Sequence, residues 1–344
     1  MRTNYGFHPQ CDREQPYLFV DACMQAWPDA EYDIAHRHGV TAYAVTAWRP
    51  HATLDEALED LMFWHLIARK HPNLGVAMTA DDIRKAKNDG KAVFIIAAQG
   101  GNFIGNKLHR IEAFYRLGLR IFLPAYNASN LICDGCLDRT DSGLTRFGQI
   151  VVDECNRVGM LLDCTHIGKR ASLDIIERSS EPVVFTHSNV KPIVDSQRNI
   201  DDEQILACVA RGGVIGLAPF GPFLLKRGKG DWPCIDDLIE HVDYVANLTG
   251  STNHIGIGTD MSLGTYPDHD HDPWGEPAYP SPGGDYDRLV CADVRSPMRA
   301  LKDWNAYPEV LNFIDKLGQK GYTHEDVAKI LGGNFMRIFD KVWK

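Results

Sequence analysis

The chain has 344 residues, of which 44% are hydrophobic and 24% charged, and this balance excludes a disordered, collagenous or low-complexity protein. Its 36 Lys and Arg residues against 46 Asp and Glu residues give a net charge of −10, which argues against nucleic acid or an anionic membrane surface as a partner. The nine cysteines favour reduced packing thiols, and no run approaches the about 20 apolar residues that span a bilayer. We therefore expect a cytoplasmic protein.

A chain of this length fits two ordinary domains or one large barrel. Short apolar, β-branched runs predict strands at 18–23, 40–48, 92–99, 119–127, 160–166, 182–188, 213–219 and 254–260. Amphipathic patterns predict helices at 53–70, 107–117, 145–158, 169–178, 201–211 and 235–248. This alternation predicts a (β/α)8 TIM barrel, although a doubly wound open sheet gives a similar pattern. No glycine-rich nucleotide-binding motif is present, which favours the barrel.

We expect one barrel domain over residues 1–344, with a long loop at 261–296 and a helical tail at 322–344. The loop is rich in Pro, Gly, Asp and Tyr, and its place after the eighth strand predicts that it overhangs the barrel mouth. It contains His269-Asp270-His271-Asp272, which could bind a metal or simply be a solvated loop segment.

Residues at the carboxyl ends of barrel strands face the active-site mouth. Here they are Cys23, Gln25, Gln99, Tyr126, Asn127, His166, His187 and Asp260. His166 and His187 end successive strands, where neutral imidazoles can converge on a zinc ion or form a hydrogen-bonded core pair. Asp260 could ligate a metal, accept a proton from a bound water, or cap the next turn.

Several motifs occur in a fixed order between about residues 93 and 339: DSGLTRFGQIVVDECNRVGMLLDCTH, PVVFTHSN, QRN, GGVIGL, HIGIGTD and LGGNFMRIF. Together they resemble the membrane (renal) dipeptidase family of the amidohydrolase superfamily. The resemblance implies a metal-dependent (β/α)8 barrel that hydrolyses dipeptides, often with a D-residue on the C-terminal side. It also implies two zinc ions bridged by a carboxylate, and a homodimer.

By this resemblance, four residues of the family site are retained. His166 and His187 match the histidines that hold the second zinc, and Asp260 matches the aspartate near the attacking water. Arg198 matches the arginine that binds the substrate carboxylate. Tyr126-Asn127 fits a substrate-facing Tyr-Asn of bacterial relatives, or else the Tyr simply packs at a strand end.

The ligands of the other half of the family site are changed. Family members end the first strand with Asp-Gly-His-Asn-Asp, whereas this chain has Cys23 and Gln25 in place of the ligating His and Asp. Gln99 replaces the bridging glutamate. Two divalent cations 3.5 Å apart repel by roughly 19 kcal/mol at an effective dielectric constant of about 20, and bridging anions must offset that repulsion. Asp260 remains, while Cys23 helps only as a thiolate.

We therefore expect at most one zinc, or none, on His166 and His187 with a third ligand from Asp260, Cys23 or Gln99. The expected function is a dipeptidase-like amidohydrolase acting on a small dipeptide or N-acyl amino acid. Asp260 and His187 would be catalytic, and Arg198, Tyr126 and Asn127 would bind a substrate that carries a carboxylate. The alternatives are a metal-free binding protein or pseudoenzyme on this scaffold, or a non-hydrolytic reaction such as decarboxylation or C–N cleavage.

Overall fold

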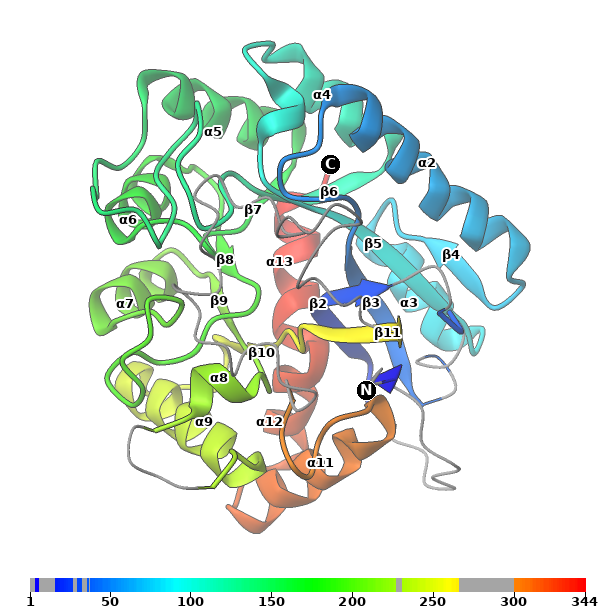
Figure 1. Cartoon of the computed structure of the whole chain (residues 1–344). Coiled ribbons are helices and arrows are strands. Elements are labelled where there is room, and N and C mark those ends of the chain that lie inside the picture. The colour runs from blue at the N-terminus through cyan, green and yellow to red at the C-terminus, as the bar shows by residue number, and fades with distance from the viewer. Residues whose placement is uncertain are drawn as a thin grey trace, which may run out of the picture.

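The computed structural model describes residues 4–5, 16–26, 30–32, 36, 38–226, 231–265 and 300–344. Every predicted strand is present, although several are shorter than the apolar run that predicts them. The strands are β2 (Phe19–Ala26), β3 (Val40–Thr46), β5 (Ala92–Gln99), β6 (Leu119–Leu123), β7 (Leu161–Leu162), β8 (Val184–Phe185), β9 (Val214–Leu217) and β10 (Ile255–Ile257). They pair in parallel, and the predicted TIM barrel is confirmed (Figure 1).

The barrel is built from two parallel sheets that meet at two seams. One sheet runs in the order β2, β3, β5, β6, β7, and the other contains β8, β9 and β10. A parallel bridge between Asp163 and Val184 joins the sheets at the first seam. At the second seam, β11 (Met261–Thr265) follows β10 and pairs in parallel with β2. The two-residue strand β1 (Asn4–Tyr5) pairs antiparallel with β11.

A buried carboxylate reinforces each seam. At the first, Asp163 accepts hydrogen bonds from the backbone N–H of Thr186 at 3.0 Å and from its hydroxyl at 2.5 Å. At the second, Asp21 accepts from the backbone N–H of Thr259 at 2.8 Å and from its hydroxyl at 2.6 Å. The Tyr307 hydroxyl also donates to Asp21, at 2.7 Å. Side chains thus supply hydrogen bonds between strands where the two sheets meet.

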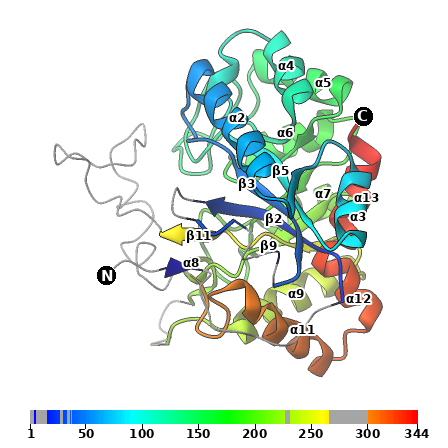
Figure 2. The ribbon, with the colours of Figure 1, turned by 90° about the vertical axis from the view of Figure 1, so that its right-hand side faces the viewer.

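The six predicted helices are confirmed and lie around the barrel (Figures 1 and 2). They are α2 (Leu54–Lys70), α4 (His109–Leu117), α5 (Arg146–Val158), α6 (Lys169–Arg178), α7 (Asp202–Ala210) and α9 (Ile235–Thr249). Their ends follow from local chemistry. Thr53 and Glu56 form a capping box at the start of α2, and Gly159 ends α5 in the left-handed conformation that glycine adopts without strain.

Some elements are absent from the sequence prediction. They are β4 (Leu74–Val76), α3 (Ala80–Asn88), the 3₁₀ turn Asn102–Ile104, α8 (Gly221–Leu224), the 3₁₀ turn Tyr307–Glu309 and α11 (Val310–Gln319). The loop prediction at 261–296 is wrong at its start, because Met261–Thr265 forms β11 through its pairing with β2. The rest of that prediction, with His269 to Asp272, lies outside the described residues.

The C-terminal segment lies against the beginning of β2, at the end of the barrel opposite the strand carboxyl termini. It consists of α12 (His324–Ala328), a π-helical turn (Lys329–Gly333) and α13 (Asn334–Val342). The turn approaches so closely that a Cβ on Gly332 would lie 2.4 Å from the carbonyl oxygen of Leu18, so only glycine fits. Beyond it, Phe335 and Phe339 pack among small residues of the strands, including Ala42.

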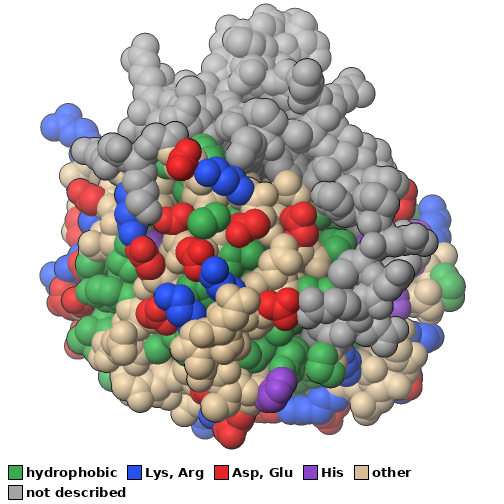
Figure 3. Space-filling view, turned by 90° about the horizontal axis from the view of Figure 1, so that it is seen from below, with side chains coloured by type: hydrophobic (Ala, Val, Ile, Leu, Met, Phe, Trp, Pro, Cys, Tyr) green, Lys and Arg blue, Asp and Glu red, His purple; other side chains and the backbone are tan. Residues whose placement is uncertain are grey.

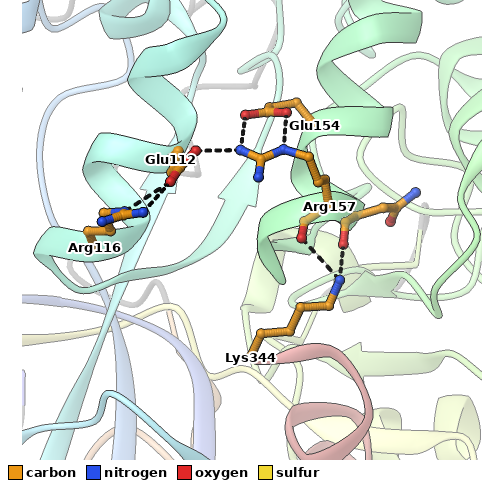
Figure 4. Close-up of polar contacts among 6 residues, drawn as sticks. Glu112, Arg116, Glu154, Arg157 and Lys344 are labelled. Carbon is orange, nitrogen blue, oxygen red and sulfur yellow. Dashed lines mark hydrogen bonds and ion pairs between the residues drawn. The ribbon is translucent and has the colours of Figure 1, made fainter.

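The last residue is held by the outer helices (Figure 4). Lys344 donates from Nζ to the carbonyl oxygens of Asn156 and Arg157, which end α5. The Arg157 side chain pairs with Glu154 at 2.7 Å on its own helix and with Glu112 at 2.5 Å on α4. None of the described helices combines the length and the apolar character that a membrane crossing requires. The seven cysteines in the described segments are free thiols.

Candidate functional site

The two histidines predicted from the strand ends meet in the structure. The Nε2 atoms of His166 and His187 lie 3.0 Å apart, and both side chains are buried. His166 follows β7 and His187 follows β8, so the first seam of the barrel brings them together. A Cβ on Gly258 would lie 3.3 Å from the Cβ of His187, which shows that the end of β10 borders the same site.

Hydrogen-bond partners define the tautomer of each imidazole. His166 Nδ1 lies 2.7 Å from Asn127 Oδ1, which can only accept, so Nδ1 carries the proton. The hydroxyl of Thr186 donates to Asp163 and lies 2.7 Å from His187 Nδ1, so this Nδ1 also carries its proton and donates to the hydroxyl oxygen. Both Nε2 atoms therefore present lone pairs toward each other.

Both histidines are held in the neutral form. Burial lowers the pKa of His166 well below its ordinary value, and the neighbouring Arg198 and His187 lower it further. Burial and then Arg198 lower the pKa of His187 in the same way. A neutral imidazole with a free Nε2 lone pair is the form that ligates a metal. Two such acceptors 3.0 Å apart are stabilised by a positive charge beside them, such as the Arg198 guanidinium or a bound cation.

Arg198 stands beside this pair as a buried cation. It is 5% exposed, and its Nη2 donates to His166 Nε2 at 3.0 Å. Its guanidinium carbon lies 5.0 Å from the centre of the Phe223 ring. Within the described ranges, no carboxylate forms an ion pair with Arg198. Because a buried charge is costly without an opposite charge, a guanidinium in this position is suited to pair with an anion.

A pocket of about 200 Å³ opens beside Arg198 and His166. It lies between the segments that follow β7 and β8, and Cys136 and Lys191 also line it. Two buried polar atoms on its wall, Ser188 Oγ and Asn199 Oδ1, have no hydrogen-bond partner among the described residues. Buried polar atoms without a partner are rare in folded proteins, so the wall of this pocket is unusually polar.

The other predicted strand-end residues form a second group. Gln25 Nε2 donates to Asp260 Oδ1 at 2.9 Å, and Gln99 Nε2 donates to Cys23 Sγ at 3.3 Å. Cys23 Sγ lies 3.9 Å from Asp260 Oδ1. Burial raises the pKa of the Cys23 thiol well above its ordinary value, and the Asp260 carboxylate raises it further. Cys23 is therefore a neutral thiol here, and Asp260 supplies the charge of this group.

The backbone is strained at three site residues. Asn127, His166 and Asp260 have φ values of 59°, 66° and 52°, and they are the only non-glycine residues in the described part of the chain with positive φ. Residues other than glycine rarely adopt this left-handed backbone conformation, and such backbone strain concentrates at functional sites. Tyr126 precedes one of these residues, and its ring stacks on His166 with centroids 3.9 Å apart.

Two residues of this site were missed by sequence reasoning. Asp163 and Thr186 connect the first seam to His187, although each lies inside an apolar run rather than at its end. A buried Asp in a strand is itself a signal, because an unpaired carboxylate is rarely buried. The partner, however, comes from a neighbouring strand and cannot be identified from one strand alone.

The candidate site offers few groups that could hold a cation. The facing nitrogens of His166 and His187 are suitable donors for a single zinc ion, whose catalytic sites usually have three protein ligands and a water. Among the described residues, no three His, Cys, Asp or Glu side chains converge to hold a metal. The Arg198 guanidinium must also leave His166 Nε2 before that nitrogen can ligate. The second group offers one carboxylate, that of Asp260.

Comparison with known proteins agrees with the family resemblance. A model of the membrane dipeptidase family, peptidase family M19, matches residues 28–272 of the chain. The dipeptidase tcpJ of Claviceps purpurea (strain 20.1) is 26% identical over 295 residues, which are 85% of this chain and 61% of that protein. An uncharacterised dipeptidase of Schizosaccharomyces pombe is 29% identical over 231 residues, covering 67% of this chain and 48% of that protein. The chain thus spans about half to two thirds of the length of these curated relatives.

Solved structures share the fold. An amidohydrolase from Pseudomonas aeruginosa is 28% identical, with a TM-score of 0.81 over 95% of this chain and 97% of that one. A metallopeptidase from Rhodobacter sphaeroides, liganded with a phosphinate mimic of the dipeptide L-Ala-D-Ala, is 18% identical. It superimposes with a TM-score of 0.77 over 96% of this chain and 100% of that one, and at this identity the likeness concerns the fold alone.

Proposed function

Because this chain belongs to the membrane dipeptidase family, peptidase family M19, we propose that it is a dipeptidase-type hydrolase of a small dipeptide or N-acyl amino acid. The observation that carries the proposal is Arg198, a buried guanidinium that contacts the histidine pair and forms no ion pair with a described carboxylate. The terminal carboxylate of such a substrate supplies the missing anion through a charge-assisted, bidentate contact. The pocket beside Arg198 gives this group room.

The proposed centre holds at most one zinc, on the Nε2 atoms of His166 and His187. Asp260 is the proposed third protein ligand, because Cys23 is a protonated thiol and Gln99 is neutral. In this structure Asp260 does not converge with the two histidines, so its side chain must move toward them for this role. When bound, zinc polarises the amide carbonyl and lowers the pKa of its water. Gln25 and Gln99 stand where the family supplies carboxylates, so the proposal includes no second ion.

The side chains of the chain itself have separate tasks in this proposal. Asp260 accepts the proton of the attacking water, as its carboxylate is the charged group of the second cluster. Asn127 fixes the orientation of His166 through Nδ1, and Thr186 does the same for His187. The Tyr126 ring lies against His166 and provides one wall of the substrate site. Arg198 moves from His166 to the substrate carboxylate.

The test combines a metal count with a hydrolysis screen. Full-length protein purified without chelators is expected to carry no more than one zinc per chain and to hydrolyse some dipeptides with an L- or D-residue at the C-terminus. His187→Ala is expected to abolish activity, and Arg198→Met to raise KM for substrates with a free carboxylate more than for their amides. Two tightly bound zinc ions per chain would refute the metal assignment.

A second candidate is a metal-free protein that binds small carboxylates. It is favoured by the contact of Arg198 with the nitrogen of His166 that a metal needs, and by the lack of a three-ligand group in the described segments. The same screen separates the two candidates. Saturable binding of dipeptides without turnover, at every zinc or manganese concentration, would leave only the binding protein.

A further inference from the structure

A third segment, the loop of residues 124–145 that follows β6, contributes to the pocket beside Arg198. Its residues on the pocket wall include Cys136, Asp138 and Asp141. The backbone N–H of Cys136 donates to the carbonyl oxygen of His166 at 2.8 Å, so the loop is anchored to the candidate site. The carboxylates of this loop are therefore held close to the histidine pair.

Several charged side chains around the pocket are already paired with one another. Lys169 forms ion pairs with Asp201 and Glu203, each at 2.7 Å. Lys191 pairs with Asp195, also at 2.7 Å. On the underside of the molecule, acidic and basic side chains likewise lie next to one another (Figure 3). The charges of the two lysines are therefore largely offset within the protein itself.

Three other charges at the pocket have no opposite charge in the described part of the chain. One is the buried guanidinium of Arg198, and the others are the carboxylates of Asp138 and Asp141. Asp138 accepts the backbone N–H of Gly135 and Asp141 accepts that of Arg170, both at 2.8 Å, but neither forms an ion pair with a described residue. Asp138 is half-buried and Asp141 is exposed. The pocket therefore has an unpaired cation at its buried end and two unpaired anions toward solvent.

These charges belong to one small space. Burial raises the pKa of the Cys136 thiol to about 11, while Arg198 lowers this pKa and Asp138 raises it, so both charges lie near the same sulfur atom. The pocket volume of about 200 Å³ is below the roughly 300–1,000 Å³ of pockets for drug-sized ligands. It therefore suits a single residue of a substrate rather than a whole peptide.

We propose that the pocket selects substrates whose C-terminal residue has a cationic side chain, such as lysine, arginine or ornithine; this inference rests on the proposed function. The α-carboxylate of that residue pairs with Arg198, and its side-chain cation extends to Asp138 and Asp141. A long basic side chain separates its two opposite charges in the same order as the pocket does. Ser188, which is 1% exposed and lines the pocket, has a hydroxyl without a described partner that is available to the carboxylate. An acidic side chain is disfavoured, because like charges then meet at the loop after β6.

The experiment measures kcat/KM of the full chain for the dipeptides Ala-Lys, Ala-norleucine and Ala-Glu, each with an L- or D-residue at the C-terminus. Norleucine has the carbon chain of lysine without the ammonium group, so this pair isolates the charge. Ala-Lys is expected to exceed Ala-norleucine by about three- to tenfold, the effect of two partly exposed ion pairs. Ala-Glu is expected to be the poorest of the three. Equal or lower values for Ala-Lys would overturn this inference and leave the proposed function standing.

A protein that hydrolyses no dipeptide would contradict the proposed function, and binding then tests the pocket separately. Isothermal titration calorimetry gives the Kd values of Nα-acetyl-lysine and Nα-acetyl-norleucine. The lysine compound is expected to bind more tightly by the same factor. Equal Kd values, or no binding of either compound, would overturn the inference.

A double variant assigns the preference to the two carboxylates. Asp138→Asn with Asp141→Asn removes both charges, while each asparagine keeps an oxygen to accept the backbone N–H that the aspartate accepts. The ratio of kcat/KM for Ala-Lys over Ala-norleucine is expected to fall to about one. The matched control is Asp55→Asn with Asp89→Asn, which removes two exposed carboxylates away from the pocket and is expected to keep the wild-type ratio. A pocket variant that keeps the ratio, or a control that loses it equally, would contradict the assignment.

Discussion

Thr186 connects a buried carboxylate to the candidate site through a single hydroxyl group. Its hydrogen is donated to Asp163 and its oxygen accepts the Nδ1–H of His187. This arrangement keeps the proton on Nδ1 and leaves Nε2 facing His166. Outer partners of this kind are known to fix the tautomer and the ring orientation of functional histidines. Thr186 is therefore a positioning residue, since it acts through His187.

We predict that Thr186→Val lowers hydrolytic activity by about 10–100-fold, the usual effect of losing such a partner. Valine has nearly the shape of threonine but accepts no hydrogen bond, so part of the His187 population moves its proton to Nε2. Thr186→Ser keeps the hydroxyl and is expected to retain most activity. Ring ¹⁵N chemical shifts of His187 report the tautomer directly. An unchanged Nδ1–H tautomer in the valine variant would contradict this assignment.

The protonation of His241 makes the free energy of unfolding depend on pH, and this effect can be measured apart from activity. It is fully buried on α9, its Nδ1 accepts the backbone N–H of Val190 at 2.9 Å, and burial lowers its pKa to about 3. The unfolded chain binds the proton near pH 6.5, so the neutral folded form is favoured above that pH. This stability is lost as the pH falls from 6.5 toward 3.

We predict that the wild type loses about 2 kcal/mol more stability than His241→Asn between pH 7.5 and pH 5, since pH 5 lies about 1.5 units below the unfolded pKa. Asparagine keeps an acceptor for Val190 but does not titrate. Urea unfolding of both proteins at both pH values measures the difference, and all other titrating groups cancel in the comparison. Parallel pH profiles for the two proteins would show that His241 does not carry this effect.

At the scale of the elements, the barrel depends on side-chain hydrogen bonds where its two sheets meet. Asp21 at the second seam is buried and accepts hydrogen bonds from the backbone N–H and the hydroxyl of Thr259. Burial raises the pKa of Asp21 to about 6. We predict that Thr259→Val costs about 1–3 kcal/mol, because it leaves a buried carboxylate with one bond fewer. The exposed substitution Thr140→Val serves as control. Equal denaturant midpoints for the two variants would mean that the backbone alone holds this seam.

The hydrogen bonds at the first seam explain why one observed strand is shorter than predicted, while two missed helices have other reasons. The apolar run at 160–166 predicts a long strand, but only Leu161–Leu162 pairs regularly, since Asp163 and Thr165 use side-chain bonds beyond it. Helix α3 is nine residues long and buries only Ala80, Ile83 and Ala86, too weak an apolar pattern to recognise in sequence. In α11, Val310, Leu311, Phe313 and Leu317 do recur at helical spacing, so this helix was predictable.

Across the whole molecule, the sequence identifies the barrel and the residues at its mouth. It does not show that these residues divide into two groups, one around the histidine pair and one around Asp260. Strand ends converge because parallel strands finish at one end of a barrel, which is why His166 and His187 meet as expected. Cys23 and Asp260 belong to another group, and this depends on side-chain directions that the sequence does not give; β2 also shifts register between Asp21 and Met24. The contact of Arg198 with His166 joins residues from separate loops, and no local pattern predicts it.

We expect the charge of the whole mouth to set how many cations it can hold, and this can be tested by restoring charge. Gln25 and Gln99 lie with Cys23 in the group around Asp260. We predict that the triple variant Cys23→His, Gln25→Asp and Gln99→Glu raises the zinc content from at most one ion per chain to two, because two new carboxylates offset repulsion between the cations. Elemental mass spectrometry of dialysed protein gives the count.

The single variant Cys23→His is the matched control for that experiment. It adds an imidazole, which is a good zinc ligand, but it adds no negative charge, and it is expected to bind no more zinc than the wild type. If charge is the limit, only the variants with restored carboxylates gain the second ion. A triple variant that binds no additional zinc would mean that the shape of the mouth, including the position of the Cys23 strand end, excludes the ion independently of charge.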